Sequence, residues 1–284
     1  HLDARRSAVR EALRLCPTEV PASLSIPAHK ALDAVAQRLA LGVDHTVVAL
    51  FGGTGSGKSS LFNALTQLNF ADVGARRPTT SRAAACSWGD DAGPLLDFLG
   101  VSSERRIRGD SILDGEDQGS MSGLVLLDVP DYDSVTTGHA LQVDRLVPLA
   151  DILVWVVDPQ KYADAALHDG YLRGLGARQE DMLVLVNQVD TLPESGLASL
   201  LDDVGSLLKD DGLSQVQVLP VSAVRGDNLD VVRSMLRQRV ARESNAARTA
   251  SAELDAITRR LRPTVARNKV ELDAELTEET TKVL

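Results

Sequence analysis

A chain of 284 residues is long enough for one large domain with appendages or for two small domains. Hydrophobic residues make up 44% and charged residues 25%, as in ordinary globular proteins, while aromatic residues reach only 3%, so the core must be built from aliphatic side chains. The formal net charge of −10 argues against a surface that coats nucleic acid, and we expect no DNA partner.

Residues 1–44 read as two helices separated by a turn that Pro17, Pro21 and Pro27 mark. From residue 46 the pattern changes to short apolar runs that alternate with amphipathic helices. Most of the runs are apolar throughout, as parallel strands covered by helices on both faces are. Strands are expected at 46–51, 124–127, 152–157, 182–186 and 216–221, and helices near 58–67, 140–149, 163–175, 197–209 and 229–242.

The order of these elements predicts a doubly wound, mostly parallel α/β sheet within a domain at residues 45–242. Ligands are expected at the carboxyl ends of its strands. The last strand contains Gln217 and Pro220 and is expected nearer an edge of the sheet. Residues 70–122 are less regular, and we expect them to hold a loop and an edge strand around 83–88.

Residues 243–284 are expected to be helical again, with a kink at Pro263. The chain begins at His1 and stops inside this helical pattern, so we expect a longer parent protein. No apolar run approaches the ~20 residues that cross a bilayer, and no secretory signal opens the chain. The two cysteines stand in no metal-ligand or CxxC spacing, which favours a reduced, cytoplasmic location.

Residues 52–59, with the sequence GGTGSGKS, fit the phosphate-binding pattern GxxxxGK[ST] between an expected strand and an expected helix. Glycines let backbone amides turn inward around a polyphosphate, and the helix N-terminus adds positive potential. Lys58 is expected to span the β- and γ-phosphates, and Ser59 to offer its hydroxyl to Mg²⁺. The predicted phosphate-binding residues are Gly53, Thr54, Gly55, Ser56, Gly57, Lys58, Ser59 and Ser60.

The phosphate loop does not choose the base, but the strand at 182–186 ends in Asn187-Gln188-Val189-Asp190. A carboxylate at Asp190 can accept from both N1–H and the 2-amino group of guanine. Adenine lacks these donors, and leaving Asp190 unpaired would cost about 1–3 kcal/mol or more. Asn187 is expected to brace the loop. The residues predicted to contact the base are Asn187, Gln188, Asp190, Ser222, Ala223 and Val224, with the Ala223 amide donating to guanine O6. An ATPase stays the alternative, since GTGSGKS also occurs in adenine-binding loops.

The segments KSSLFNAL (58–65), NQVD (187–190) and SAVRGDNL (222–229) resemble the TRAFAC class of GTPases, on the Era and dynamin side. LLDVPDYDS and ADILVWVVDPQKYADAALH are similar to the YfjP-like GTPases of actinobacteria. The resemblance covers the whole of 45–242 and implies a GTP phosphohydrolase that uses GTP, GDP and Mg²⁺. Its fourth motif is usually NKxD. Gln188 replaces the lysine whose stem packs over the base, so we expect somewhat weaker nucleotide affinity.

The same resemblance implies that Asp128 holds Mg²⁺ through a water molecule. It also implies that a threonine of the segment RPTT (77–80) closes over Mg²⁺ and the γ-phosphate, and we favour Thr80 over Thr79. Asp131 stands where the family has glycine, and we expect its side chain to point outward or to order the loop. Tyr132 replaces the water-orienting glutamine, which predicts slow unaided turnover. The catalytic set is then Lys58, Thr80 and Asp128, and the metal set is Ser59, Thr80 and Asp128.

Three uses of such a site stay open. In the first, GTP drives homodimerisation of G domains and moves a helical neck formed by residues 1–44 and 243–284. This would take place at the cytoplasmic face of a membrane, which the parent protein would reach through parts absent here. Whichever use applies, the loop at 158–162 is expected to support the nucleotide edge or a dimer contact. In the second, the protein docks on ribosomal particles, which the acidic charge and the missing RNA-binding domain disfavour. In the third, it binds GTP but barely hydrolyses it.

Overall fold

The computed structural model describes residues 2–16, 20–41, 45–67, 83–109, 121–133, 137–240 and 245–265. The chain forms two compact units. The larger unit spans residues 34–253, and the smaller unit combines the residues up to 33 with those from 254 onward. The domain boundaries drawn from the sequence, after residues 44 and 242, stay predictions.

The larger unit is built on a seven-stranded sheet. Its strands are β1 (Thr46–Gly52), β2 (Ala84–Ser87), β3 (Arg106–Arg108), β4 (Leu124–Asp128), β5 (Ile152–Val157), β6 (Met182–Val186) and β7 (Gln217–Pro220). They lie in the order β3-β2-β4-β1-β5-β6-β7, and every neighbouring pair is parallel except β2 and β4. The mostly parallel α/β sheet is thus confirmed, and β7 lies at an edge, as its Gln217 and Pro220 predict.

The central strands are buried along their whole length, which explains their continuous apolar sequence. Every residue of β1, β4, β5 and β6 is buried. A strand needs this composition only when helices cover both of its faces. The covering helices are α3 (Lys58–Thr66), α4 (Gly93–Leu99), α5 (Thr137–Leu146), α6 (Ala165–Gly170), α7 (Glu194–Asp210) and α8 (Leu229–Val240).

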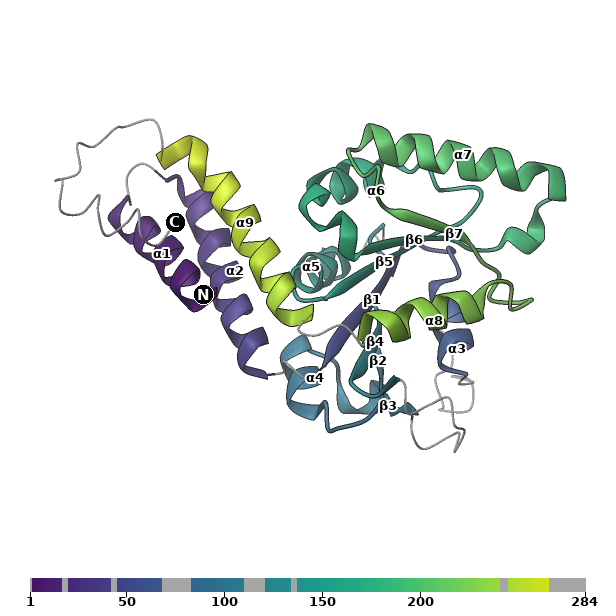
Figure 1. Ribbon diagram of the computed structural model, residues 1–284, viewed down its shortest axis with the longest axis horizontal. Coiled ribbons are helices and arrows are strands. Elements are labelled where there is room, and N and C mark those ends of the chain that lie inside the picture. Colours follow the sequence, from purple (N-terminus) through teal and green to yellow (C-terminus); the bar gives the residue numbers. More distant parts are fainter. Residues whose placement is uncertain are drawn as a thin grey trace. The chain divides into compact units, whose positions relative to one another are not determined.

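Alternate residues of β1 enter two separate cores, one on each face of the sheet. Val47 and Phe51 pack with side chains of α4, α5, α6 and α7. Val48 and Leu50 point the other way and pack with side chains of α3 and α8. The helices therefore form a layer on each side of the sheet (Figure 1), and the doubly wound arrangement is confirmed.

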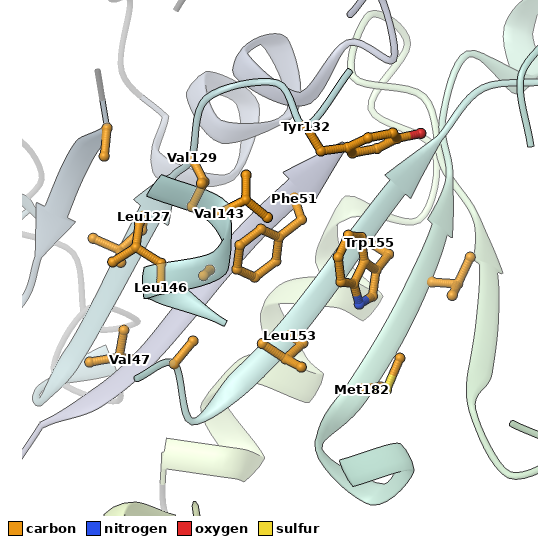
Figure 2. Close-up of a cluster of buried hydrophobic side chains, with 14 of the residues drawn as sticks. Val47, Phe51, Leu127, Val129, Tyr132, Val143, Leu146, Leu153, Trp155 and Met182 are labelled. Carbon is orange, nitrogen blue, oxygen red and sulfur yellow. The ribbon is translucent and has the colours of Figure 1, made fainter. Parts of the chain in front are cut away.

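Phe51 is the core residue of β1 that lies next to the loop following this strand. Its ring stacks on Trp155 of β5 with 4.9 Å between ring centroids. Trp155 also contacts the ring of Tyr171 at 5.6 Å, and Tyr171 contacts Tyr132 at 5.7 Å. Figure 2 shows Phe51, Trp155 and Tyr132 on this side of the sheet. A continuous row of aromatic rings thus joins the central strands to the loop that follows β4.

Two regions differ from the sequence prediction. Between residues 70 and 122 the chain forms α4 and β3 as well as β2, and β3 takes the edge position that was expected for the strand near 83–88. The helix expected at 163–175 is shorter, because α6 ends at Gly170 and two 3₁₀ segments follow it. These elements are held by contacts with the sheet, which sequence periodicity does not record.

The smaller unit has a separate apolar core. It draws on α1 (Leu2–Leu15), α2 (Ala22–Leu41) and α9 (Asn245–Val265). Its buried side chains are Leu13, Val20, Ala28, Leu32, Leu254, Ile257 and Leu261. The sequence prediction of a turn at Pro27 is wrong, since Pro27 lies inside α2. One proline removes a single backbone hydrogen bond, which burial of Leu32 on the same helix offsets.

Pro263 lies inside α9. None of the helices in the described part of the chain combines the length and the apolar character needed to cross a bilayer.

Candidate functional site

The loop between β1 and the N-terminus of α3 is shaped by glycines. Gly55 and Gly57 have φ angles of +85° and +80°, a region that side chains with a Cβ rarely adopt. A Cβ added to Gly57 would lie only 2.3 Å from the Nδ2 atom of Asn187. Gly57 therefore satisfies two constraints together, a left-handed backbone and a close approach of a second loop.

Lys58, the first residue of α3, is buried beside two carboxylates. Its Nζ atom lies 3.0 Å from Oδ1 of Asp128 and 3.3 Å from Oδ1 of Asp131. Burial alone would lower the pKa of Lys58, but the two carboxylates outweigh it and hold the pKa above its ordinary value. The ammonium group stays charged at neutral pH. Of the two alternatives for Asp131, the outward orientation is wrong, since its carboxylate turns inward to this cation. The ordering of the loop by Asp131 stays a prediction.

Thr54 is held from two sides by residues of opposite charge. Its backbone N–H and its hydroxyl both donate to Oδ1 of Asp133, at 2.7 and 2.9 Å. Its carbonyl oxygen accepts from Nζ of Lys161 at 2.8 Å. Asp133 belongs to the loop after β4, and Lys161 to the loop after β5. The carboxyl ends of the neighbouring strands thus converge on the loop after β1.

The loop after β6 is attached to the same place by side-chain amides. Asn187 donates through Nδ2 to the carbonyl of Ser56 at 2.9 Å, and its Oδ1 accepts from the backbone N–H of Ala223 at 3.2 Å. Gln188 donates to the carbonyl of Gly55 at 2.7 Å and has a left-handed backbone, with φ of +64°. Asn187 therefore joins three loops, which matches the bracing role predicted from the sequence.

Asp190 is fixed by the next loop along the sheet. The hydroxyl of Ser222, which follows β7, donates to Oδ1 of Asp190 at 2.6 Å. The same hydroxyl oxygen accepts from the backbone N–H of Arg225 at 3.0 Å. Ser222 is completely buried, whereas Val224 is 83% exposed. The two loops predicted to read the base are thus joined by a direct hydrogen bond.

Tyr132 lies at the edge of the site but is largely buried. Its hydroxyl donates to Oδ2 of Asp164 at 3.3 Å. Burial, followed by the charge of Asp164 and of Asp133, raises the pKa of Tyr132 far above its ordinary value. The phenol is therefore neutral at physiological pH and serves as a hydrogen-bond donor to Asp164.

The structure brings the described members of the predicted site together at one end of the sheet. Thr80 and Thr79 lie outside the described residues. The sequence analysis did not single out Asp133 and Asp164 as members of the site, and it named Lys161 only as part of the loop at 158–162. Asp133 is the third acidic residue of the segment that begins at Asp128, and Lys161 lies in a loop that follows a central strand. Their positions after these strands were the only indication in the sequence that the two residues belong to the site.

The profile of the 50S ribosome-binding GTPases matches residues 47–188, from the first strand to the start of the NQVD motif. The chain belongs to this family. Its members are P-loop GTPases, so the chain contains a GTPase domain. Curated proteins searched by sequence gave no match.

Solved structures share the fold at low sequence identity. Two come from an oligomerised bacterial dynamin pair, described as a mechanism for long-range sensing and tethering of membranes. Both have a TM-score of 0.51 and cover 99% of this chain, with 14% and 15% identity. The chain spans 58% and 49% of their lengths. The Era protein of Aquifex aeolicus bound to GDP and aluminium fluoride has 18% identity and a TM-score of 0.43, covering 67% of this chain and 55% of that one. The likeness to the dynamin pair concerns the fold alone.

Proposed function

We propose that this GTPase domain reads guanine through Asp190 and holds the phosphates on residues 53–60. The observation that carries the proposal is the bond between Ser222 and Asp190, which fixes the carboxylate while each of its two oxygens keeps a lone pair for the base. Guanine offers two adjacent donors to such a carboxylate, and adenine offers none in that position. The bonds from Asn187 and Gln188 to the phosphate loop tie base recognition to phosphate binding.

Mg²⁺ fits the residues at the phosphate end of this site. Ser59 and Asp128 present a hydroxyl and a carboxylate, the hard oxygen donors that Mg²⁺ prefers. The Asp128 carboxylate reaches Lys58, which directly precedes Ser59, so the two donors come from adjoining points of the fold. Among the described residues, no group of three or more His, Cys, Asp or Glu side chains could hold a metal. Mg²⁺ would therefore need phosphate oxygens and water as further ligands, together with Thr80 of the RPTT segment as a further proposed ligand. Bound there, the ion neutralises charge on the phosphates.

Slow unaided hydrolysis is the second part of the proposal. Tyr132 is a neutral phenol engaged with Asp164, so it offers no carboxamide to orient an attacking water. Asp131 places a carboxylate beside Lys58, where it competes with a γ-phosphate for the same cation. Both features lower the rate of the chemical step, and a partner or a second G domain would have to supply the missing groups.

For the cellular role, we propose a dynamin-like switch in which GTP promotes association of two G domains near a membrane, on its cytoplasmic side. The likeness of fold to the bacterial dynamin pair supports this, because it extends over the flanking helices. The alternative is docking on the large ribosomal subunit, which the family description favours. The net charge of −10 disfavours contact with RNA.

Calorimetric titration with GDP, a non-hydrolysable GTP analogue and ADP, in the presence of Mg²⁺, tests nucleotide recognition. We expect the guanine nucleotides to bind at least about tenfold more tightly than ADP, since an unpaired Asp190 costs roughly 1.4 kcal/mol or more. Lys58→Ala should abolish measurable GTP binding, because it removes the buried cation. Lys209→Ala, an exposed lysine on α7, is the matched control. Tighter binding of ADP than GDP would overturn the assignment.

Single-turnover phosphate release at increasing protein concentration tests the role. A rate that rises with concentration supports activation by dimerisation. A rate that rises only when 50S subunits are added supports the ribosomal alternative, and no release under either condition supports a binding module.

A further inference from the structure

Thr54 receives contacts from two charged residues that the recognised motifs leave without a role. Asp133 accepts both hydrogen bonds that the Thr54 amide and hydroxyl can donate. Lys161 donates to the carbonyl of the same residue. A phosphate-binding loop works by offering its backbone amides to anionic oxygens. In this structure a carboxylate oxygen already occupies one of those amides.

Asp133 lies against the first residues of the phosphate loop. Its Oδ2 atom lies 3.1 Å from the position a Cβ on Gly53 would take, so the carboxylate sits against the start of the phosphate loop. Asp131, two residues earlier, forms an ion pair with Lys58. Two carboxylates of one loop thus occupy a cation and an amide that belong to the phosphate site. A γ-phosphate carries roughly two negative charges near neutral pH and would be repelled by both.

Lys161 adds a positive charge beside the same part of the phosphate loop. Within the residues that the structure describes, Lys161 forms no ion pair, and its ammonium donates to a neutral carbonyl. An ammonium has three donors, so it has capacity for an anionic oxygen. The loop that carries it is fixed, because the buried Asp158 accepts from the backbone N–H groups of Gln160 and Lys161 at 2.9 and 3.1 Å.

We propose that Asp133 and Lys161, which carry opposite charges and both bind Thr54, together set the preference of the nucleotide site for GTP over GDP. Without a γ-phosphate, Asp133 holds the Thr54 amide. When GTP binds, its γ-phosphate displaces the carboxylate of Asp133 and takes a charge-assisted hydrogen bond from Lys161. This inference rests on the proposed nucleotide site and adds the residues that distinguish the triphosphate from the diphosphate.

The experiment measures dissociation constants of the full chain for GDP and for a non-hydrolysable GTP analogue in Mg²⁺. Lys161→Ala should weaken the GTP analogue by about tenfold or more and change GDP by less than about twofold, because only the triphosphate contacts the ammonium. Lys161→Arg should restore most of the lost affinity. Lys209→Ala is the matched lysine control.

Asp133→Asn is the complementary variant. The amide oxygen of asparagine can still accept from Thr54, so the local structure is kept while the charge is removed. We expect the GTP analogue to bind several-fold more tightly and GDP to be little changed. Asp202→Asn, an exposed position on α7, is the matched control, and thermal melting verifies that each variant is folded.

The outcomes separate this inference from the proposed function. If the unmodified protein binds neither nucleotide, the nucleotide site itself is wrong and the inference falls with it. If it binds both, but Lys161→Ala leaves the GTP analogue unaffected or weakens both nucleotides equally, Lys161 does not read the γ-phosphate. Looser binding of the GTP analogue in Asp133→Asn would overturn the role of Asp133.

Discussion

Gly57 occupies the position in the phosphate loop where a side chain is least tolerated. Its backbone is left-handed, and a Cβ would meet the amide of Asn187 at 2.3 Å. Asn187 in turn holds Ser56 and Ala223. A single added methyl group would therefore disturb both the phosphate loop and the loops that read the base.

We predict that Gly57→Ala lowers GDP affinity by about 100-fold or more, since two hydrogen bonds at Asn187 are displaced. Gly212→Ala is the control. Gly212 also has positive φ, at +81°, but a Cβ there would meet nothing within 4 Å. That variant should lose about 1–2 kcal/mol of stability and keep its GDP affinity. Calorimetric titration of both variants separates steric contact from backbone strain. Equal loss of affinity in the two would show that the contact with Asn187 is irrelevant.

Asp190 gives a second prediction for a single residue. In Asp190→Asn the amide oxygen can still accept from Ser222, while the amide nitrogen can donate to the O2 atom that xanthine carries in place of the guanine amine. We therefore expect xanthosine diphosphate to compete with GDP for the variant but not for the unmodified protein. A competition binding assay, with Asp202→Asn as the control variant, measures how well xanthosine diphosphate displaces GDP. Strict guanine preference in Asp190→Asn would count against the assigned base contact.

At the scale of elements, Arg178 joins a 3₁₀ segment to the turn that follows α5. It is 3% exposed and donates to the carbonyls of Val147 and Ala150 at 2.8 and 2.6 Å. Burial lowers its pKa. We predict that Arg178→Met reduces the free energy of unfolding by about 2–4 kcal/mol, because buried carbonyls lose a charged donor. Urea denaturation checks this, with the exposed Arg260→Met as control. A loss of unfolding free energy in Arg178→Met no larger than that in the control would contradict this prediction.

The elements that sequence could predict are those whose composition reports their burial. The central strands are uninterrupted apolar runs, and the glycines and Lys58 follow the first of them at fixed spacing. By contrast, α4 has seven residues and β3 has three, too few to show a period, and they are fixed by packing. The inward turn of Asp131 and the contact of Lys161 with Thr54 depend on the paths of two loops, which residue spacing does not determine.

At the scale of the whole molecule, the two compact units have separate cores. Leu32 is completely buried in the smaller one. We predict that Leu32→Ala destabilises this unit by about 2–5 kcal/mol while GDP affinity stays within about twofold, since the nucleotide site lies in the other unit. Ile26→Ala on the same helix, at a residue 55% exposed, is the control. Denaturant unfolding followed in parallel with GDP titration measures both. A matching loss of GDP affinity would show that the units depend on each other.

The aromatic row behind the site gives the protein an internal optical signal. The chain has two tryptophans. Trp155 stacks on Phe51, which leads into the phosphate loop, and makes a tilted contact with Tyr171, which in turn contacts Tyr132. Trp88 belongs to the core on the opposite face of the sheet. A displacement of Tyr132 that shifts Tyr171 changes the surroundings of the indole, so emission spectra recorded on a Trp88→Phe background can follow such a movement in real time without an attached dye.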